Sequence, residues 1–156
     1  MIQHIKIRRA IKSDAQDLSK LILENANSTL LPHYNEEQWA VFTKYYSIEE
    51  TEKKIKEWVF FCADIEGEIA GAVALNNNFV VGFYTKLAFL RKGIGQMLMK
   101  HIEEYASQND ISELQLAASP EGLEFYLKHD WKKIKASIFY HYGVGFEETL
   151  MSKNLK

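Results

Sequence analysis

The sequence predicts an α/β (α+β) fold in which helices cover both faces of one mixed sheet of about seven strands. Two observations lead to this prediction. Stretches of alternating or continuous apolar residues are interspersed with stretches whose apolar residues recur every three to four positions. Three strand-like stretches are joined by short turns, whereas a later one is reached only through a long helical segment. An antiparallel part and a parallel part are therefore expected to share one sheet.

The first elements are a short strand and a helix. Ile5 and Ile7 alternate with polar residues and predict the strand, and Ser13 followed by Gln16 forms a capping-box pattern at a helix start. The helix has its apolar residues on one face: Leu18, Leu21 and Ile22. Residues 25–35 are polar and are expected to form a long loop, of a length often found facing a substrate.

Two further helices are predicted before the meander. Asn35 followed by Gln38 starts one, and Ser47 followed by Glu50 starts another that runs through Ile55. Aromatic residues and one histidine are concentrated around the first of these helices: His33, Tyr34, Trp39, Phe42, Tyr45 and Tyr46. Packing in the core explains the aromatic residues, and lining a pocket for an acceptor molecule explains them as well.

Three strands follow in close succession, over residues 59–64, 68–75 and 79–90. A Glu66-Gly67 turn joins the first two, and a run of asparagines at 76–78 joins the second to the third. Because such short connections link neighbouring antiparallel strands, the sequence predicts a meander. The apolar run containing Cys62 belongs to its first strand, so we expect this thiol to be a small core residue.

After the third strand the chain turns through Arg91, Lys92, Gly93 and Gly95 into an amphipathic helix. The helix has one continuous apolar face: Ile94, Met97, Leu98, His101, Ile102 and Tyr105. A helix start offers free N–H groups and a partial positive charge, and glycines let a ligand approach the backbone. The corner therefore suits a phosphate or pyrophosphate, although a tight turn with a basic flank has the same pattern.

Two common phosphate-binding motifs do not fit this corner. A dinucleotide-binding fingerprint needs a third glycine where this chain has Leu98. A Walker A motif, with its glycines followed by Lys and Ser or Thr, is absent from the sequence.

The last part of the chain predicts one strand, one helix and two final strands. Residues 113–118 follow a helical crossover and are expected to run parallel to the preceding strand. Ser119 as N-cap and Pro120 as the first helical residue start a helix. Its apolar residues are Leu123, Tyr126 and Leu127. Two strands, at about 131–142 and 146–155, end the chain, and this last hairpin could pair across a homodimer.

The whole chain, residues 1–156, is expected to form a single domain. Its net charge of −2, with 19 basic and 21 acidic residues, argues against nucleic acid or an anionic membrane as a partner. One cysteine cannot form an internal disulfide, and no stretch approaches a membrane span or a signal peptide, so we expect a cytoplasmic protein.

The order of these elements and several local patterns resemble the GCN5-related N-acetyltransferase (GNAT) family over nearly the full length. The patterns are Ile7-Arg8-Arg9-Ala10 with Asp14, Gly93-Ile94-Gly95, Ala118-Ser119-Pro120-Glu121 leading to Phe125-Tyr126, and Met151-x-Lys153-x-Leu155. The resemblance implies a GNAT-like fold and the transfer of an acetyl group from acetyl-CoA to a primary amine of a small molecule or peptide. It implies direct transfer, with acetyl-CoA as cosubstrate and no metal.

The resemblance also assigns residues. Backbone amides from about Arg91 to Gln96 would bind the pyrophosphate, and Tyr126 would protonate the leaving thiolate. Pantetheine would lie between the strand ending near residues 87–89 and the strand at 114–118. The cofactor-binding residues implied in this way are Leu87, Ala88, Phe89, Arg91, Lys92, Gly93, Ile94, Gly95, Gln96 and Ser119.

The chain departs from the family pattern at two places. Leu90 stands where the family usually has Arg or Gln, and Asp130-Trp131 replaces the usual Gly-Phe, which requires a positive φ at Asp130. No carboxylate falls within the central strand, where several members keep a base, so His141, Tyr84 or a water chain are the candidates. A non-catalytic module that binds acyl-CoA or a protein partner is the alternative function.

Overall fold

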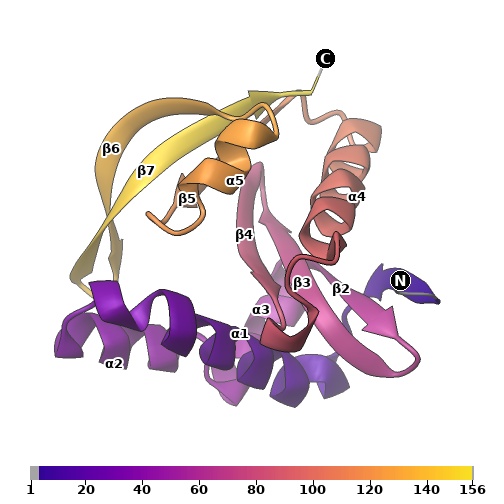
Figure 1. Ribbon diagram of the computed structural model, residues 1–156, viewed down its shortest axis with the longest axis horizontal. Coiled ribbons are helices and arrows are strands. Elements are labelled where there is room, and N and C mark those ends of the chain that lie inside the picture. The colour runs from indigo at the N-terminus through magenta and orange to yellow at the C-terminus, as the bar shows by residue number, and fades with distance from the viewer. Residues whose placement is uncertain (1–3, 156) are drawn as a thin grey trace.

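The computed structural model describes residues 4–155, which form one seven-stranded mixed sheet with the order β1-β2-β3-β4-β5-β7-β6 (Figure 1). Neighbouring strands are antiparallel except for β4 and β5, which are parallel. The strands are β1 (Ile5–Arg9), β2 (Val59–Ile65), β3 (Glu68–Asn76), β4 (Phe79–Thr85), β5 (Glu113–Ala118), β6 (Lys132–His141) and β7 (Val144–Asn154). The predicted α/β fold with a meander followed by a parallel crossover is confirmed.

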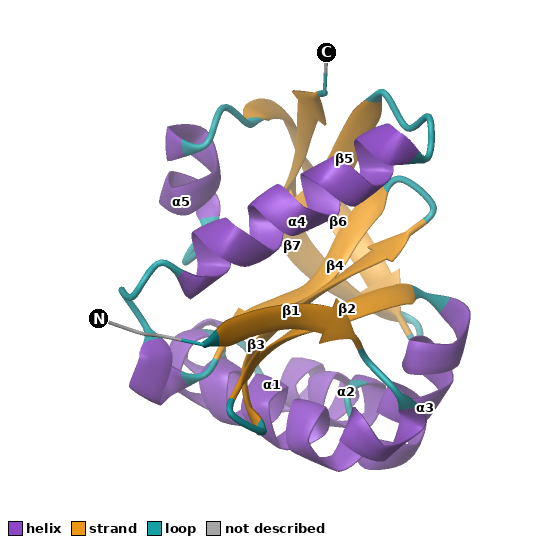
Figure 2. Cartoon of the chain, turned by 90° about the vertical axis from the view of Figure 1, so that its right-hand side faces the viewer, coloured by secondary structure: helices purple, strands orange, loops and turns teal. Residues whose placement is uncertain are grey.

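Helices lie on both faces of this sheet (Figure 2). One face is covered by α1 (Ala15–Thr29), α2 (Glu36–Tyr45) and α3 (Ile48–Glu57), and the other by α4 (Ile94–Gln108) and the short α5 (Leu123–Lys128). Single 3-10 turns, at Lys12–Asp14, Leu31–His33 and Leu87–Phe89, connect several elements. The sheet therefore separates two apolar layers.

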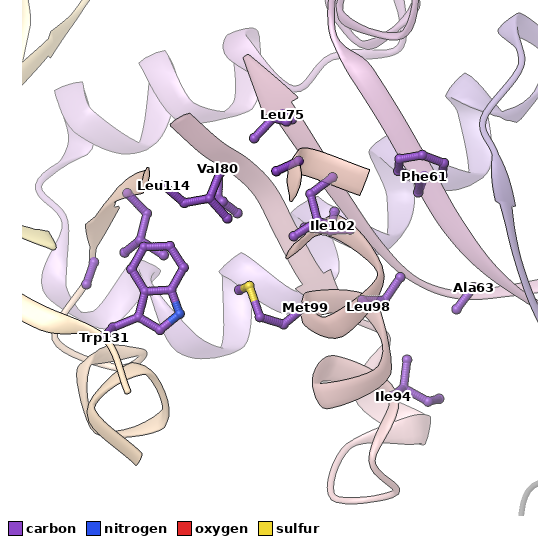
Figure 3. Packing of buried hydrophobic residues seen from close by; sticks show 14 of the residues in the cluster. Phe61, Ala63, Leu75, Val80, Ile94, Leu98, Met99, Ile102, Leu114 and Trp131 are labelled. Carbon is purple, nitrogen blue, oxygen red and sulfur yellow. The ribbon is translucent and has the colours of Figure 1, made fainter. Parts of the chain in front are cut away.

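The layer under α4 is held by close packing of the helix on β3 (Figure 3). A Cβ placed on Gly71 of β3 would lie 2.9 Å from Leu98 Cδ1 and 3.2 Å from Ile94 Cγ2, so only glycine lets the helix come this near. Ile102 lies on the same buried stripe, whereas Met97 is 40% exposed. The predicted apolar face of this helix is thus right except at Met97. Met99, which was not predicted to face the core, is buried.

The layer on the other face is more aromatic. Phe42 and Tyr46 from α2 pack against Phe60 of β2 and the buried face of α1. Cys62 lies in the same layer and is fully buried, as expected, and burial raises the pKa of its thiol to about 11. The thiol therefore stays protonated and has a packing role.

Arg8 ties the first strand to the rest of this layer. Its guanidinium donates to both carboxylate oxygens of Asp14, at 2.9 and 3.0 Å, and to Asp64 Oδ2 of β2 at 2.8 Å. These bonds to Arg8 hold the pKa of Asp14 and of Asp64 below their ordinary value. Arg8 and Asp14, which belong to the pattern shared with the family, thus hold the segment between β1 and α1 in place.

The two halves of the sheet part between β4 and β5. The only residue pair between these strands is Phe79 with Gln115, at the beginning of β4. Further along, β4 has a bulge, because Val81 is paired with Ala74 and Tyr84 with Ala72, so Gly82 and Phe83 face one residue of β3. Gly82 has a φ of 60°, which glycine adopts without strain. β4 and β5 thus diverge, and their facing edges are left without partners.

Several predicted boundaries were wrong. The stretch 25–35 is not a loop, since α1 continues to Thr29 and Leu31–His33 form a 3-10 turn. The helix predicted at Ser13 starts at Ala15, because residues 12–14 first form a 3-10 turn closed by Asp14, whose carboxylate accepts from the Ile11 N–H. The strand predicted to reach Leu90 ends at Thr85.

Candidate active site

A cleft of about 670 Å³ opens where β4 and β5 diverge. Its walls come from α1, α2, β4, β5, α5 and the final hairpin, and one end reaches the start of α4. Asn25 of α1 is buried and donates from Nδ2 to the carbonyl of Thr85 at 2.6 Å, so the end of β4 is held against α1. The cleft is therefore bounded by elements that are tied together.

The corner before α4 has the geometry that the glycines predict. Arg91 and Gly93 both have positive φ, 62° and 83°, and Gly93 is the N-cap of the helix. The first helical bond runs from the Met97 N–H to the Gly93 carbonyl, so the N–H groups of Ile94, Gly95 and Gln96 lie ahead of any helical acceptor. Space around Gly93 is open, since a Cβ there would meet no atom within 4 Å.

Most of the predicted cofactor-binding residues lie at this end of the cleft. Seven of them line it: Phe89, Arg91, Gly93, Ile94, Gly95, Gln96 and Ser119. Leu87, Ala88 and Lys92 are exposed and are not part of its wall. The physical reason is the early end of β4, because Leu87–Phe89 form a 3-10 turn whose last N–H groups are already bonded within it. The edge of β4 that lines the cleft without pairing to β5 is thus Val81–Thr85, and the Thr85 carbonyl at its end is bonded to Asn25.

Tyr126 of α5 lines the same cleft. Its ring contacts Phe83 of β4 and Trp131, with centroids 6.1 and 6.0 Å apart. Burial, and then the nearby carboxylate of Glu148, raise the pKa of the Tyr126 phenol far above its ordinary value of 10.0. The phenol therefore keeps its proton throughout the neutral range and can donate it inside the cleft.

The tyrosine helix itself begins later than predicted. Ser119 and Pro120 are part of a turn closed by the Gly122 N–H and the Ser119 carbonyl at 3.1 Å, and α5 starts at Leu123. Leu127, predicted on the apolar face, is 46% exposed. Asp130 does take a positive φ, 70°, as its place after the helix required.

Glu148 is a cleft residue that sequence reasoning missed. It lies on β7, half-buried, and no side-chain hydrogen bond or ion pair to it occurs among residues 4–155. Burial alone raises the pKa of its carboxyl to about 7. A signal was present in the sequence, because Phe146, Glu148 and Leu150 alternate on one face of the strand, and a carboxylate on an otherwise apolar face is unusual.

An aromatic wall lines the same cleft as Glu148. Its members are the aromatic side chains that line the cleft on the α2 side and touch one another: Tyr34, Phe42, Tyr46, Tyr84 and Phe146. Glu148 helps to raise the pKa of three of these phenols, those of Tyr34, Tyr46 and Tyr84, although burial is the first cause for each. The carboxylate therefore lies near these three tyrosines in the cleft.

Tyr84 and His141 are the two side chains that the sequence suggested as a general base. Tyr84 and His141 both line the cleft. Burial raises the pKa of Tyr84 well above 10.0, which makes it a poor base. Burial and then Lys54 lower the pKa of His141, whose ring lies 4.7 Å from that of Tyr45.

His101 and His129 have packing and hydrogen-bonding roles outside the cleft. His101 packs edge-on against Phe61 with centroids 4.5 Å apart. His129, at the end of α5, bonds through Nδ1 to the Phe125 carbonyl at 2.8 Å and stacks on the Phe125 ring. Neither residue is part of the cleft wall.

Coenzyme A fits this cleft on structural grounds. Its pyrophosphate suits the free N–H groups and the open space at Gly93, with Arg91 alongside, and a thin chain bearing amides suits two unpaired strand edges. Within residues 4–155 no cluster of three metal-binding side chains occurs. None of the helices described there is long and apolar enough to span a membrane.

Comparison with known proteins agrees with this geometry. A family model described as an acetyltransferase (GNAT) domain matches residues 30–155. A GCN5-related N-acetyltransferase from Rhodopseudomonas palustris has a similar structure, with a TM-score of 0.88 at 17% identity over 99% of this chain and 98% of the other. The PaiA N-acetyltransferase from Thermoplasma acidophilum, solved in complex with coenzyme A, also has a similar structure. Its TM-score is 0.82 at 22% identity, over 97% of this chain and 99% of the other.

Another acetyltransferase of the same family, from Staphylococcus aureus Mu50, has a TM-score of 0.73 at 18% identity, with coverage of 98% and 100%. At these identities the solved structures show a shared fold. The match to the family model rests on the sequence itself.

Proposed function

Since the chain belongs to the GNAT acetyltransferase family, we propose that it transfers the acetyl group of acetyl-CoA directly to a primary amine of a small molecule or peptide. One observation carries the proposal most strongly. The cleft between β4 and β5 joins a helix start with free N–H groups to a half-buried tyrosine, Tyr126, in one continuous space. These are a phosphate site and a proton donor, as an acyl-CoA reaction requires.

The proposed cosubstrate site runs along the cleft from one end to the other. The N–H groups of Ile94, Gly95 and Gln96, with Arg91, would hold the pyrophosphate, and the free edges of β4 and β5 would hold the pantetheine amides. The PaiA N-acetyltransferase, solved with coenzyme A, has the same fold and supports this placement. Leu87, Ala88 and Lys92 have no assigned contact in this proposal.

Acetyl-CoA supplies a thioester whose carbonyl carbon is open to attack. The chain must then polarise the carbonyl, protonate the leaving sulfur and remove a proton from the amine. Backbone N–H groups on the edge of β4 that is not paired with β5 would polarise the carbonyl. Tyr126 donates its phenolic proton to the sulfur as the C–S bond breaks. The third contribution is the removal of a proton from the incoming ammonium group.

Two measurements on the purified protein test this proposal. A ligand that binds only the folded state raises the free energy of unfolding by RT ln(1 + [L]/Kd), about 2.7 kcal/mol at a hundredfold excess over Kd. We therefore expect CoA and acetyl-CoA to raise the melting temperature. We also expect acetyl-CoA to release free thiol only when an amine is added.

The same measurements separate the alternative function. A module that binds acyl-CoA without turnover would show the thermal shift and release no thiol with any amine. Absence of both effects at millimolar CoA would remove the cosubstrate assignment altogether. Action in the cytoplasm, expected from the sequence, remains a prediction.

A further inference from the structure

We propose that Glu148 receives the ammonium group of the acceptor and takes its proton, and that the acceptor is a cationic amine on a flat apolar body without a carboxylate of its own. This inference rests on the proposed acetyl transfer and names the acceptor class for the same cleft.

Position is the first argument. β7 is paired with β5 up to Thr149, which is opposite Ala118, so Glu148 lies just beyond the last pair, where the cleft opens. Tyr126, the proposed proton donor, lines the same cleft and is close enough to the carboxylate for its pKa to be affected. A nitrogen bound at Glu148 therefore lies on the side of the cleft where the thioester would be held.

The state of the carboxylate is the second argument. A half-buried carboxylate without a partner is costly, and proteins normally pair such groups. No side chain among residues 4–155 donates a hydrogen bond to Glu148 or forms an ion pair with it. A cationic ligand would supply the missing partner, whereas a purely structural carboxylate would be expected to have one within the chain.

The wall around Glu148 gives the third argument, because it sets the shape of the acceptor. Tyr34 contacts Phe146 and Phe42, with centroids 5.2 and 6.0 Å apart, and Tyr84 contacts Phe42 and Tyr46 at 6.4 and 6.0 Å. Aromatic faces attract cations and pack well on flat apolar groups. The site thus offers one anion in an apolar surround, which selects a single positive charge on an apolar body.

The charges that face the site are few. The groups that titrate around Glu148 are the phenols of Tyr34, Tyr46, Tyr84 and Tyr126, and all four keep their protons at neutral pH because burial raises each pKa. His141 lies against the wall, with its ring 5.5 Å from that of Phe146, and Arg91 and Glu121 also line the cleft. Lys54 is not part of the cleft wall, and its Nζ donates to the Tyr45 carbonyl and lies 5.5 Å from the Tyr46 ring. None of these charges shifts the pKa of Glu148, so a second carboxylate brought in by the acceptor would meet Glu148 with no cation beside it.

The proton balance of the reaction is complete with these groups. The ammonium gives one proton to Glu148, and the freed lone pair forms the C–N bond while the C–S bond breaks. The sulfur takes the phenolic proton of Tyr126, and the second proton lost by the nitrogen returns to that phenol. Glu148 then releases its proton to solvent, so one proton is produced for each amide formed.

The test compares phenethylamine with phenylalanine, which has the same ring and ammonium group and an added carboxylate. With the wild-type protein we expect kcat/KM for phenethylamine to exceed that for phenylalanine about tenfold or more, because like charges brought together are strongly disfavoured. Equal use of the two would overturn the proposed acceptor class.

The variant Glu148→Gln keeps the shape and removes the base. We expect kcat/KM for phenethylamine to fall about 10²-fold or more, and the rise of the wild-type kcat/KM with pH near neutrality to disappear. The control is Glu147→Gln, an exposed neighbour on the other face of the strand, which should behave as wild type. The thermal shift with CoA should be the same in all three proteins.

Two results would overturn the assignment, and they can be told apart. If the wild type acetylates phenethylamine and Glu148→Gln keeps both its rate and its pH profile, Glu148 is not the base, while the acetyl transfer itself stands. If no amine in a broad panel is acetylated although CoA raises the melting temperature, the proposed function fails, and this inference fails with it.

Discussion

Tyr126 is the residue on which the proposed release of the thiolate depends. We expect Tyr126→Phe to lower kcat about 10²- to 10⁴-fold, the usual contribution of a general acid, with little change in the Kd for acetyl-CoA. The reason is that the phenolic proton is used only as the C–S bond breaks. Steady-state kinetics with an accepted amine, and titration of acetyl-CoA, measure the two quantities.

The control for Tyr126→Phe is Tyr140→Phe, since Tyr140 is 68% exposed on β6 and is not part of the cleft wall. If Tyr126 only packs, its Phe variant would lose a little stability and keep full kcat between pH 6 and 9. That outcome would assign the protonation of the thiolate to water or to another group.

Glu148 also makes a prediction about stability. Its pKa is raised to about 7 in the folded chain from an ordinary 4.5, so the folded state binds this proton more tightly than the unfolded state. The resulting stabilisation is fully present below about pH 4.5 and is lost as the pH rises through 7. Glu148→Gln, which is always neutral, should therefore raise the melting temperature relative to wild type more at pH 8 than at pH 5.

Thermal unfolding at the two pH values, without ligand, measures this difference. Glu147→Gln is again the matched control and should show no such dependence on pH. A difference between Glu148→Gln and wild type that is the same at pH 5 and pH 8 would mean that the carboxyl has its ordinary pKa in the folded protein.

At the scale of single elements, the start of α4 is the proposed pyrophosphate site. A Cβ on Gly95 would lie 3.4 Å from Phe83 Cζ, which is an ordinary contact. A protein with a larger residue at this position can therefore still fold, but the new side chain would project toward the cleft. We expect Gly95→Val to weaken CoA binding much more than it lowers stability. Calorimetric titration of CoA and thermal unfolding without ligand measure the two effects.

Ser107→Val, exposed in the last turn of the same helix, is the control for the lower helix propensity of valine. Gly93 is unsuitable for this test, because its φ of 83° would strain any other residue. Normal CoA affinity in a folded Gly95→Val protein would mean that the corner is only a turn.

The first strand and α1 are joined by Arg8. Asp14 and Asp64 have a lowered pKa when folded, so their contribution to stability is present above about pH 4 and is lost as the pH falls through the folded values. We expect Arg8→Gln to destabilise the protein at pH 7 and to make the acid limb of its unfolding curve shallower. Unfolding in urea at a series of pH values measures this.

Arg9→Gln removes the same charge from the next residue, whose guanidinium lies over Phe61 and Tyr105 and not against a carboxylate. It should therefore lower the free energy of unfolding similarly at all pH values. An acid limb for Arg8→Gln that is as steep as that of wild type would contradict the role of Arg8.

The elements also show where sequence reasoning succeeds. The meander, the α4 corner and the parallel β5 were predicted because turn residues and helical periodicity are local signals. The start of α5 was missed because Ser119-Pro120 is a strong helix-start pattern, whereas Gly122 two residues later weakens a helix and the turn there is completed by its backbone. The length of α1 was missed because polar residues such as Asn25 are buried by tertiary contacts.

Across the whole molecule, the candidate site was predictable only in part. The α4 corner and Tyr126 each belong to a pattern within about ten residues. Glu148 meets the aromatic wall only through the pairing of β7 with β5 and the packing of α2 on the sheet, and a strand that slips by one residue presents its other face. The alternation of Phe146, Glu148 and Leu150 places Glu148 on the apolar face of its strand, but only the long-range pairing shows that this face lines the cleft.

The molecule as a whole is built for direct transfer, because the cleft brings the proposed proton donor and the proposed base to one space and the buried Cys62 cannot serve as an acyl carrier. The most direct measurement uses acetyl-CoA labelled with deuterium in the acetyl methyl group, with phenethylamine and the wild-type protein. Mass spectrometry of the amine and of the intact protein is combined with a count of the thiol released. We predict labelled N-acetyl product equal in amount to the thiol, and no acetylated protein when the amine is left out. Thiol released without amine, or label found on the protein before the amine is added, would contradict the account.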